Sequence, residues 1–468
     1  MMKTDTFYLG IDLGTSAAKG ILRSLDGTSF QAKRSYDANT PGAWKSAIKE
    51  LISDLTAKSG RKIAAIGFSS QVGTYVIDGN EVLPWHSSAG REELDFLKSI
   101  ISDTEFEAEI SMRHPELVSY PLPRLLHIQK RYGEGHEVLM PKELLIRELT
   151  GQTRTDLFSM RGIANLERGT YAKELLKKAD IRLKLPPIGR PTDVAGYVTE
   201  DAAREYGLSP RTPIYLGCND FFAGLLGMGI YNVGDAFDLS GTSEHVGYIG
   251  ESINPDAFVS GTYFVGNCTY GGTKSSGASC DFAIKNFGID GIDVDRVLTQ
   301  NPPIFLPYLN GERAPIFDDD ARGVYFGLGE KTDPKALAYS TLEGVVFSLY
   351  DIASGMRMPT PNKLICGGGS AKNPLMNMLR ASLFGCEVVS VRENDTSALG
   401  ACMIAMVGHG AYQSLSDAIS DHVTYGDAAK PMPQYQEILK KRFLIYKELY
   451  KNLKPTFHHF HEIQESTK

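Results

Sequence analysis

The sequence predicts an α/β protein made of two duplicated domains with a cleft between them, and three observations support this. The chain has 468 residues, which is too long for one hydrophobic core. Apolar strand-like runs alternate with helical patterns in both halves, which indicates mixed sheets covered by helices. The run Asp-Leu-Gly-Thr-Ser at 12–16 recurs as Asp-Leu-Ser-Gly-Thr-Ser at 238–243, and a repeat this widely spaced suggests a duplication. We expect domains at 1–236 and 237–454, followed by a polar tail at 455–468.

Composition narrows the class of function. Hydrophobic residues make up 42% and charged residues 22% of the chain, and the net charge is −7 without a basic stripe, which argues against nucleic-acid binding. The six cysteines form no C-x-x-C pair, so redox and zinc motifs have no support and reduced thiols are expected. No signal peptide and no apolar run of membrane-spanning length is evident. We therefore expect a cytoplasmic protein without membrane contact.

The first strand pair is expected at 7–22, where two apolar runs flank a tight turn. The turn combines a carboxylate, an open glycine backbone, two hydroxyls and a lysine, which are the groups that hold a polyphosphate and its magnesium. Alone this motif is weak, because many turns use these residues. Its second copy at 238–243 suggests two hairpins that would pinch a triphosphate from both sides. The residues of the first turn are Asp12, Gly14, Thr15, Ser16 and Lys19.

The rest of the first half follows from periodicity and turn residues. An apolar face and a terminal glycine predict a helix at 43–58, and a buried strand at 63–68 ends in polar residues, as expected beside a cleft. The further elements are a hairpin at 75–77 and 81–83, helices within 90–150, a helix at 200–206 and a strand at 213–216.

Asp220 comes at the end of this last strand, before a small apolar helix that should be buried. One interpretation is a helix cap, which stabilises by about 1 kcal/mol. The other is a carboxylate in a cleft that accepts a proton. The segment alone favours the cap, and the two interpretations are compatible.

In the second half, a strand followed by Gly367, Gly368 and Gly369 and then a helix lets the backbone approach a ligand closely. An ordinary strand-to-helix turn with a crowded crossing is the alternative. The other expected elements are helices at 278–287, 334–353, 374–384, 396–408 and 433–452 and strands at 363–366 and 387–391.

The ordered set of motifs resembles the FGGY carbohydrate kinases over roughly residues 7 to 450, and xylulose kinases are the most similar members. The resemblance implies the actin-like ATPase fold and phosphorylation of a small sugar, here a ketopentose such as xylulose, with ATP and Mg2+. The motifs are Asp12 to Thr15, Gly217-x-x-Asp220, Gly241 to Ser243, Gly311 to Pro315, Glu343-Gly344, Gly367 to Gly369 with Asn373, and Ser397 to Ala401.

The resemblance also implies a role for each matching position. Asp220 would be the general base and Asp12 the metal-site aspartate. The first phosphate loop would contain Gly14, Thr15, Ser16 and Lys19, and the second Gly241 and Thr242. The adenine and ribose site would contain Gly277, Gly368, Gly369, Lys372 and Asn373. The sugar side would contain Gln71, Trp85, His86 and Asn219.

The sequence departs from the family pattern at three places, the first two of which bear on the substrate. The usual W-x-D-x-R run lacks its aspartate after Trp85, and Arg91 comes two positions late. Val72 and Gly73 replace the residues that follow Gln71 in xylulose kinases. Arg380 to Ser382 differs from the usual Ala-Asp, which we interpret as a surface change. The sugar and the hydroxyl phosphorylated are therefore open.

Two rival functions and several unassigned motifs remain. An actin-like ATPase that moves or binds partners would share the hairpins, and a non-catalytic sugar sensor would share the fold. A homodimer is open, since dimers are common in the family but no interface can be identified. We interpret Asp318 to Asp320 as a solvated loop, His458 to His461 as a flexible tail, and Glu312-Arg313 as an internal ion pair.

Overall fold

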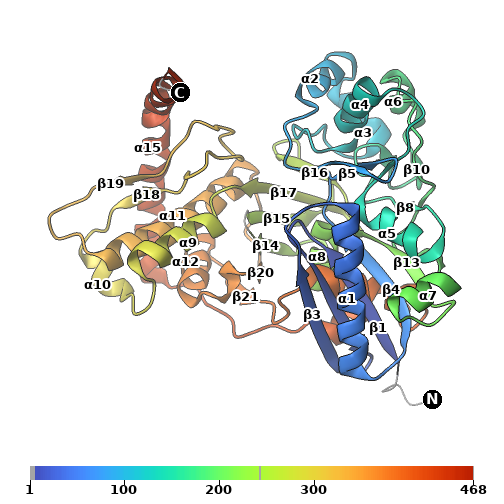
Figure 1. Ribbon diagram of the computed structural model, residues 1–468. Helices are drawn as coiled ribbons and strands as arrows, with labels where there is room; N and C mark the ends of the chain where they lie inside the picture. The colour runs from blue at the N-terminus through green and yellow to red at the C-terminus, as the bar shows by residue number, and fades with distance from the viewer. Residues whose placement is uncertain (1–5, 242–243, 467–468) are drawn as a thin grey trace. The chain divides into compact units, whose positions relative to one another are not determined.

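The computed structural model describes residues 6–241 and 244–466 and divides into two compact units (Figure 1). Unit 1 contains 1–231, 261–264 and 395–423, and unit 2 contains 232–260, 265–394 and 424–468. The predicted boundary at 236/237 therefore lies close to 231/232, where the chain first passes from unit 1 to unit 2. The prediction placed residues 395–423 in the second domain, whereas in the structure they return to unit 1.

Unit 1 is built on a mixed six-stranded sheet. A hairpin strand pair extends antiparallel to one side of β1, while β4 and β13 run parallel to it on the other. This confirms the predicted strand, turn and strand at 7–22. The order is β12 (Val194–Tyr197), β13 (Pro213–Asn219), β4 (Ile63–Ser70), β1 (Phe7–Leu13), β2 (Ala17–Ser24) and β3 (Ser29–Ser35).

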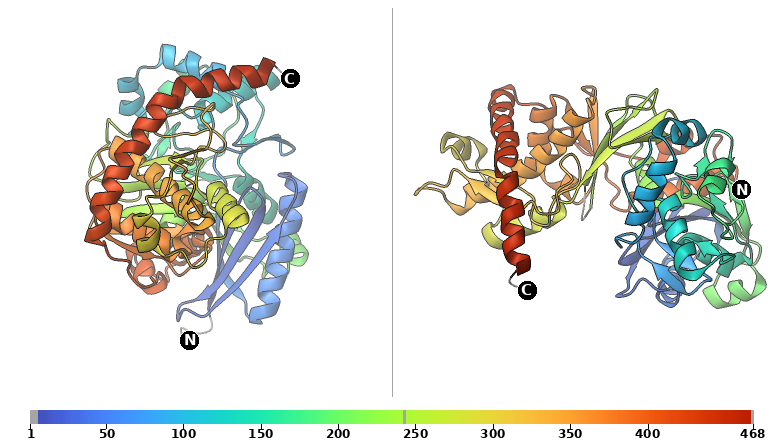
Figure 2. Two further views of the ribbon diagram at one scale, coloured as in Figure 1. Left: turned by 90° about the vertical axis from the view of Figure 1, so that its left-hand side faces the viewer. Right: turned by 90° about the horizontal axis from the view of Figure 1, so that it is seen from above.

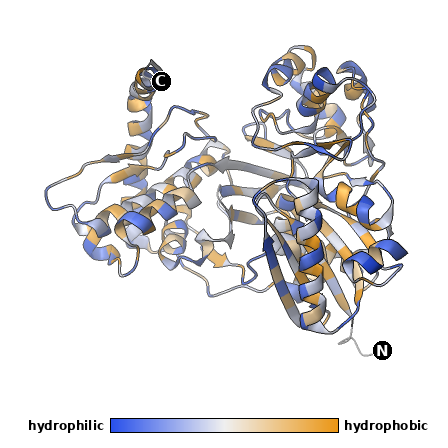
Figure 3. Ribbon diagram, in the orientation of Figure 1, coloured by the Kyte–Doolittle hydropathy of each residue, from blue (hydrophilic) through white to orange (hydrophobic). Residues whose placement is uncertain are grey.

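Helix α1 (Pro41–Ser59) covers the hairpin side of this sheet (Figure 1). Its N-cap Thr40 accepts a hydrogen bond from the Ala43 amide, and Gly60 ends the helix in the left-handed conformation with φ of 60°. The buried side chains of α1 include Trp44, Leu51 and Leu55. They form the apolar face of an amphipathic helix. Figure 3 shows the polar edge strand β3 in blue, whereas the inner strands are mainly orange.

Most of the remaining elements of unit 1 lie between β4 and β13 in sequence. The predicted hairpin is present as β5 (Tyr75–Ile77) and β6 (Glu81–Leu83), joined by β7 (Val138–Leu139). The helices are α2 (Arg91–Ile100), α3 (Asp103–Ile110), α4 (Pro121–Tyr132), α5 (Pro141–Thr150), α6 (Lys173–Lys178) and α7 (Glu200–Tyr206), with short strands β8 (Thr155–Asp156), β9 (Ala164–Asn165), β10 (Thr170–Tyr171) and β11 (Ile188–Gly189).

Two apolar helices, α8 (Asp220–Gly227) and α13 (Thr396–Gly408), pack into the back of the unit 1 sheet through glycines. A Cβ added at Gly400 would lie 1.9 Å from the Ala223 carbonyl oxygen, and one at Gly67 would lie 2.1 Å from the Ala401 carbonyl oxygen. These contacts need bare backbone, because no side chain fits at that separation. They explain why α13 belongs to unit 1 although the sequence prediction placed it in the second domain.

Unit 2 repeats the strand arrangement of unit 1. Its hairpin β14–β15 is antiparallel, and β14 runs parallel to β20, just as β1 does to β4. This equivalent pattern supports the predicted duplication and the two-domain α/β class. The order is β16 (Val259–Thr262), β17 (Asn267–Thr273), β15 (Glu244–Gly250), β14 (Ala236–Ser240), β20 (Lys363–Gly368) and β21 (Glu387–Ser390).

The helices of unit 2 surround a separate core centred on α11 (Pro334–Gly355). The final helix α15 (Pro433–Ser466) is longer than the predicted helix at 433–452 and is the long red helix in both views of Figure 2. The expected polar tail is therefore helical as far as Ser466. The other elements are α9 (Gly277–Phe287), α10 (Val294–Thr299), β18 (Ile304–Leu306), β19 (Val324–Phe326), η2 (Ser370–Lys372), α12 (Pro374–Phe384) and α14 (Leu415–His422), the last of which lies in unit 1.

Among the helices in the described part of the chain, none has the length and apolar character needed to cross a bilayer. The described cysteines are free thiols, five of them buried and Cys280 partly so.

Candidate active site

Asp12 ends β1 in the middle of the unit 1 sheet, where it is buried. Its Oδ1 accepts a hydrogen bond of 2.7 Å from the Ser69 hydroxyl at the end of the neighbouring parallel strand β4. Burial raises the pKa of Asp12, and the Ser69 hydrogen bond and the Lys19 charge only partly oppose this. Such a carboxylate gains from a cation, so its surroundings fit a magnesium site.

Asp220 is the first residue of α8, at the end of β13. Its Oδ1 accepts a hydrogen bond of 2.9 Å from the Phe221 amide. Burial, followed by repulsion from Asp12, raises the pKa of Asp220 to about 7. The structure thus brings the two carboxylates close enough to influence each other, both at strand ends of unit 1.

The N-cap of α8 is Asn219 rather than Asp220, because the Asn219 side chain accepts a hydrogen bond of 2.8 Å from the Phe222 amide. Its Nδ2 donates to the Phe158 carbonyl at 3.0 Å. The residue that caps the helix is therefore Asn219, one position before the predicted Asp220. The Asp220 carboxylate is not used as the N-cap. Asn219 already uses both ends of its amide within unit 1, so its part is to fix the start of α8.

Lys19 lies opposite Asp12 in the β1–β2 hairpin. Its Nζ is 3.0 Å from the Asp395 carboxylate at the start of α13. Burial opposes the charge, but the neighbouring carboxylates, Asp395 first, raise the pKa of Lys19 and keep it protonated. Asp395 was not predicted as a site residue. In the sequence it is only an aspartate at a helix-cap position far from Lys19, and no local pattern connects the two.

The first turn is held by its carbonyl groups. The Gly14 carbonyl accepts hydrogen bonds from Tyr36 and Gln71, and the Thr15 carbonyl accepts one of 2.7 Å from Asn39. Because C=O and N–H of one peptide point in opposite directions, the amides of Thr15 and Ser16 are directed away from these anchors. Thr15 and Ser16 are exposed, so the turn is suited to receive phosphate oxygens.

The predicted sugar-side residues divide into two groups. Gln71 is buried and uses its side chain on Gly14, Asn39 and Thr74. Trp85 and His86 are exposed, and the Trp85 indole donates to the Thr15 hydroxyl at 3.0 Å. Trp85 thus contacts the turn directly through the Thr15 side chain. Gln71 contacts the backbone of the same turn, at the Gly14 carbonyl.

Arg91 begins α2 and is exposed. Gly90 before it has a φ of 95°, in the left-handed region that favours glycine. The extra residues between Trp85 and Arg91 thus place the arginine at the outer start of a helix. No described contact connects Arg91 with Asp12 or Asp220.

The second hairpin ends in a buried ion network that the sequence reasoning missed. Arg380 Nε lies 2.6 Å from Asp238, its Nη2 lies 2.6 Å from Glu244, and these three residues are at most 1% exposed. Ser370 donates a hydrogen bond of 2.6 Å to Glu244 and thereby ties in the glycine-rich turn. The interpretation of Arg380 as a surface change is wrong, because the two acids that it neutralises are far away in sequence.

Burial holds the pKa of Asp238 well above its usual range despite Arg380, whereas the arginine lowers the pKa of Glu244 below its usual value. The Arg380 guanidinium is thus shared by two buried carboxyl groups. Asp238 stands where Asp12 stands in unit 1, but it already has a direct cationic partner. Of the two equivalent aspartates, Asp12 is the one suited to a metal ion.

The residues predicted for the adenine and ribose site lie at the end of β20, in the segment that follows it and at the start of α9. Gly368, with φ of 85°, crosses β14 so closely that a Cβ would lie 1.9 Å from the Ser240 carbonyl oxygen. Asn373 caps α12 by accepting hydrogen bonds from two amides, while Gly369 and Lys372 are exposed and Gly277 begins α9. Gly241 is exposed. Thr242 lies outside the described residues.

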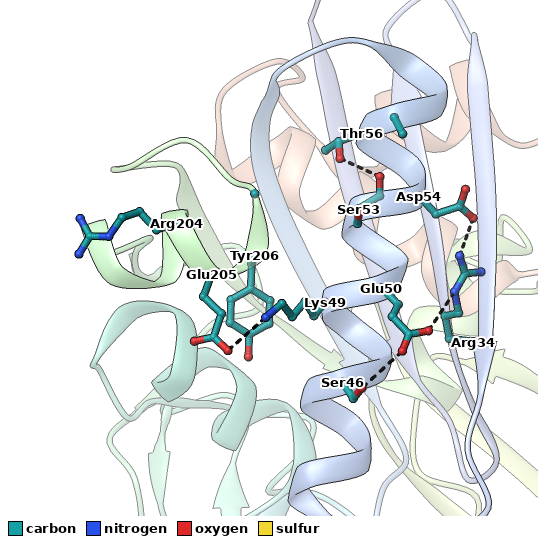
Figure 4. Close-up of a pocket in the computed structure, with 12 residues that line it drawn as sticks. Arg34, Ser46, Lys49, Glu50, Ser53, Asp54, Thr56, Arg204, Glu205 and Tyr206 are labelled. Atoms are coloured by element: carbon teal, nitrogen blue, oxygen red, sulfur yellow. Dashed lines mark hydrogen bonds and ion pairs between the residues drawn. The ribbon is translucent and has the colours of Figure 1, made fainter.

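A separate pocket of about 860 Å³ lies between α1 and α7 (Figure 4). Its charged side chains are engaged with one another, as in the pair of Lys49 with Glu205 at 3.7 Å and that of Arg34 with Asp54 at 3.0 Å. It contains none of the predicted site residues, and its paired charges are typical of a solvated surface.

Comparison with known proteins matches both halves of the chain to one family. Residues 7–227 match the N-terminal domain, and residues 290–409 the C-terminal domain, of the FGGY family of carbohydrate kinases. The xylulose kinase of Lactococcus lactis is 28% identical and aligns with 98% of this chain and 99% of its own length. A gluconokinase of Bacillus subtilis is 26% identical over 91% of this chain and 93% of its own.

Solved structures that resemble this chain are also carbohydrate kinases. A gluconate kinase and a ligand-bound xylulose kinase, both from Lactobacillus acidophilus, each superpose with a TM-score of 0.84 and 26% identity. Each comparison covers 97% of this chain, with 99% of the gluconate kinase and 100% of the xylulose kinase.

Proposed function

The chain belongs to the FGGY family of carbohydrate kinases, which have the actin-like ATPase fold and use ATP as phosphate donor, and on this basis we propose that it phosphorylates a primary hydroxyl of a ketopentose such as xylulose with Asp220 as general base. Two carboxylates support the proposal, Asp12 near the end of β1 and Asp220 directly after β13, with β4 between the two strands. Asp220 has a pKa raised to about 7, which is near the ideal for a base that works at neutral pH. The xylulose kinases among its relatives support the sugar class.

In the proposed reaction, Asp220 orients the sugar hydroxyl and takes its proton as that oxygen attacks the terminal phosphorus of ATP. The bond from this phosphorus to the bridging oxygen breaks, and ADP leaves. Lys19 and the outward amides of Thr15 and Ser16 stabilise charge on the transferred oxygens. Asp12 would hold Mg2+, which supplies positive charge for the terminal phosphates. In unit 2 we assign the second phosphate loop to Gly241 and Thr242, and the adenosine portion to Gly277, Gly368, Gly369, Lys372 and Asn373.

The test is a substrate panel. The purified chain is mixed with ATP, Mg2+ and single ketoses, polyols or aldonates, and ADP release is followed. Release that depends on a ketopentose supports the proposal. Release without any sugar favours a partner-moving ATPase, and no release with any sugar favours a sensor.

A second candidate substrate, an aldonic acid such as gluconate, is favoured by Arg161. Its side chain is 5% exposed, and its guanidinium lies 5.0 Å from the centre of the Phe222 ring, two residues after Asp220. Its Nε and Nη2 have no hydrogen-bond partner among the described residues. A buried guanidinium without a counter-charge is costly, and a substrate carboxylate would supply that charge.

Arg161→Met separates the two substrates, because it keeps the volume and removes the charge. If the substrate is an aldonate, KM for it should rise at least about tenfold, the effect of losing one charged hydrogen bond. If the substrate is a ketose, its KM should stay within about twofold. A phosphorylation product detected only with gluconate would exclude the ketopentose assignment.

A further inference from the structure

Two segments that are 140 residues apart in sequence meet on unit 2. One is the loop after Gly311 to Pro315, which carries Asp318 and Asp320, and the other is the end of α15, which carries His458 and His461. His458 Nε2 lies 3.3 Å from Asp318 Oδ2, and His461 Nδ1 lies 3.5 Å from Asp320 Oδ1. One ligand atom from each of Asp318, Asp320 and His458 lies within 4.8 Å of the others. The expected solvated loop and flexible tail are thus parts of one cluster.

We propose that Asp318, Asp320 and His458 bind Zn2+, and that His461, which lies 3.5 Å from Asp320, moves in as the fourth ligand. Zn2+ takes imidazole nitrogen and carboxylate oxygen at about 2.0–2.2 Å in a tetrahedron, whose edges are then about 3.3–3.5 Å long. The two His–Asp separations of 3.3 and 3.5 Å match that edge. The ligand atoms of Asp318, Asp320 and His458 lie within 4.8 Å of one another, so the group must contract by up to about 1 Å around the ion. The two histidines are three residues apart on a helix, and this spacing places them on the same face.

The supporting contacts are those of a fixed site. Asp318 pairs with Glu312 through both backbone groups, at 2.8 and 3.0 Å. The Tyr450 hydroxyl, on the same helix as the histidines, donates to Asp318 Oδ2 at 2.9 Å, and the Asp320 amide donates to its Oδ1 at 3.0 Å. Outer hydrogen bonds of this kind orient metal ligands. They hold the buried carboxylate of Asp318 in place before an ion arrives.

Charge and ligand type favour Zn2+ over the harder ions. Two carboxylates and two neutral imidazoles carry a charge of −2, which a divalent ion balances. Mg2+ and Ca2+ prefer oxygen ligands alone, whereas imidazole suits zinc. Asp319 is engaged elsewhere, since it pairs with Lys274. With His461 as the fourth ligand no coordination position stays open, so the proposed site is structural and fastens the end of α15 to the loop.

The partial exposure of both histidines, 45% for His458 and 39% for His461, gives an ion access from solvent. It also permits conservative variants that need not disturb the core. His459 is a matched control in the same short run, because it is 74% exposed and lies beside Glu462 instead of the cluster.

The experiment titrates the chelator-treated full chain with Zn2+ by calorimetry, and with Co2+ by visible absorption, without nucleotide or Mg2+. The wild type and His459→Ala should bind one ion with the intense absorption of tetrahedral Co2+. His458→Ala and His461→Ala should each bind at least about tenfold more weakly, with unchanged circular dichroism.

Two results would overturn the proposal. One is a wild type that binds no stoichiometric Zn2+, which would leave two His–Asp ion pairs only. The other is binding that persists in both single variants, which would place the ion at other residues. Neither result bears on sugar phosphorylation, because no substrate is present.

Discussion

Asp12 and Asp238 occupy equivalent strand ends, yet their surroundings differ in charge. Asp238 has the Arg380 guanidinium at 2.6 Å, whereas the lysine nearest Asp12 is paired with Asp395. The two hairpins are therefore similar in backbone but differ in the charged side chains around the aspartate, which is why we assign the metal ion to Asp12 in the proposed function.

The pH dependence of activity should follow Asp220. A base must be deprotonated, so kcat/KM for the sugar should fall below pH 7 with a limiting slope of one, because the pKa of this carboxyl is raised to about 7. Asp220→Asn should lower kcat by about 10² to 10⁴ while ATP still binds. Steady-state kinetics from pH 5.5 to 9, with ATP binding measured by calorimetry, check this. Retained turnover in the variant would remove Asp220 from the role of base.

The same substitution should stabilise the protein at alkaline pH. A carboxyl whose folded pKa is raised from 3.8 to about 7 favours the folded state most below pH 3.8, and this contribution is lost as pH rises to 7. Asp220→Asn removes that loss, which is at most about 4 kcal/mol for a shift of this size. Urea unfolding should show a larger gain for the variant at pH 8 than at pH 5. A destabilised variant at pH 8 would mean that Asp220 has a structural role.

Arg380→Met should destabilise unit 2 strongly. It leaves Glu244 and Asp238 buried without their cation, and breaking such a network costs about 3–5 kcal/mol. Arg357→Met is a control, since Arg357 is 79% exposed and its pair with Asp256 should contribute less than about 1 kcal/mol. Urea unfolding measures both variants. A loss below 1 kcal/mol for Arg380→Met would show that water reaches the network.

At the scale of elements, most helices and strands were predictable because periodicity and caps are local signals. The prediction of α12 and α13 matches their observed bounds, and α1 differs by two residues at its start and one at its end. What could not be predicted is non-local. Arg380 looks like a surface residue on α12 until β14 and β15 bring their acids to it, and α13 joins unit 1 through glycine contacts that no local pattern reveals.

Gly400→Ala tests the contact between α13 and α8. The new Cβ would meet the Ala223 carbonyl oxygen at 1.9 Å, so the helices must separate, at a cost of about 1–3 kcal/mol or more. Asp395 and Ser397 at the start of α13 should shift with it, and since they contact Lys19 and the Asp220 backbone, kcat should fall.

Gly42→Ala in α1 is the matched control. A Cβ at Gly42 has open space, and its φ is not in the left-handed region, so stability should rise by about 0.5–1 kcal/mol. Thermal unfolding and turnover measured together check both variants. Equal stability of the two would contradict the close packing of α13.

At the scale of the whole molecule, unit 1 combines the first half of the chain with a segment from far along it, residues 395–423. A fragment that ends at residue 236, the predicted domain boundary, lacks α13 and exposes the apolar surfaces of β1, β4 and α8 that it covers. We expect this fragment to aggregate or to bind a hydrophobic dye. Adding a linker and residues 395–423 should restore cooperative unfolding. A cooperative transition in the short fragment would show that α13 is dispensable for the fold.

The return of 395–423 to unit 1 also means that unit 1 can be completed only late in synthesis on the ribosome. About 190 residues separate Tyr231 from Val423, and at about 5–20 residues per second they take roughly 10 to 40 s to translate. During that interval the nascent first sheet lacks the helix that fills its back face. We therefore expect the apolar back face of this sheet to stay exposed for longer than in a chain whose domains are continuous in sequence.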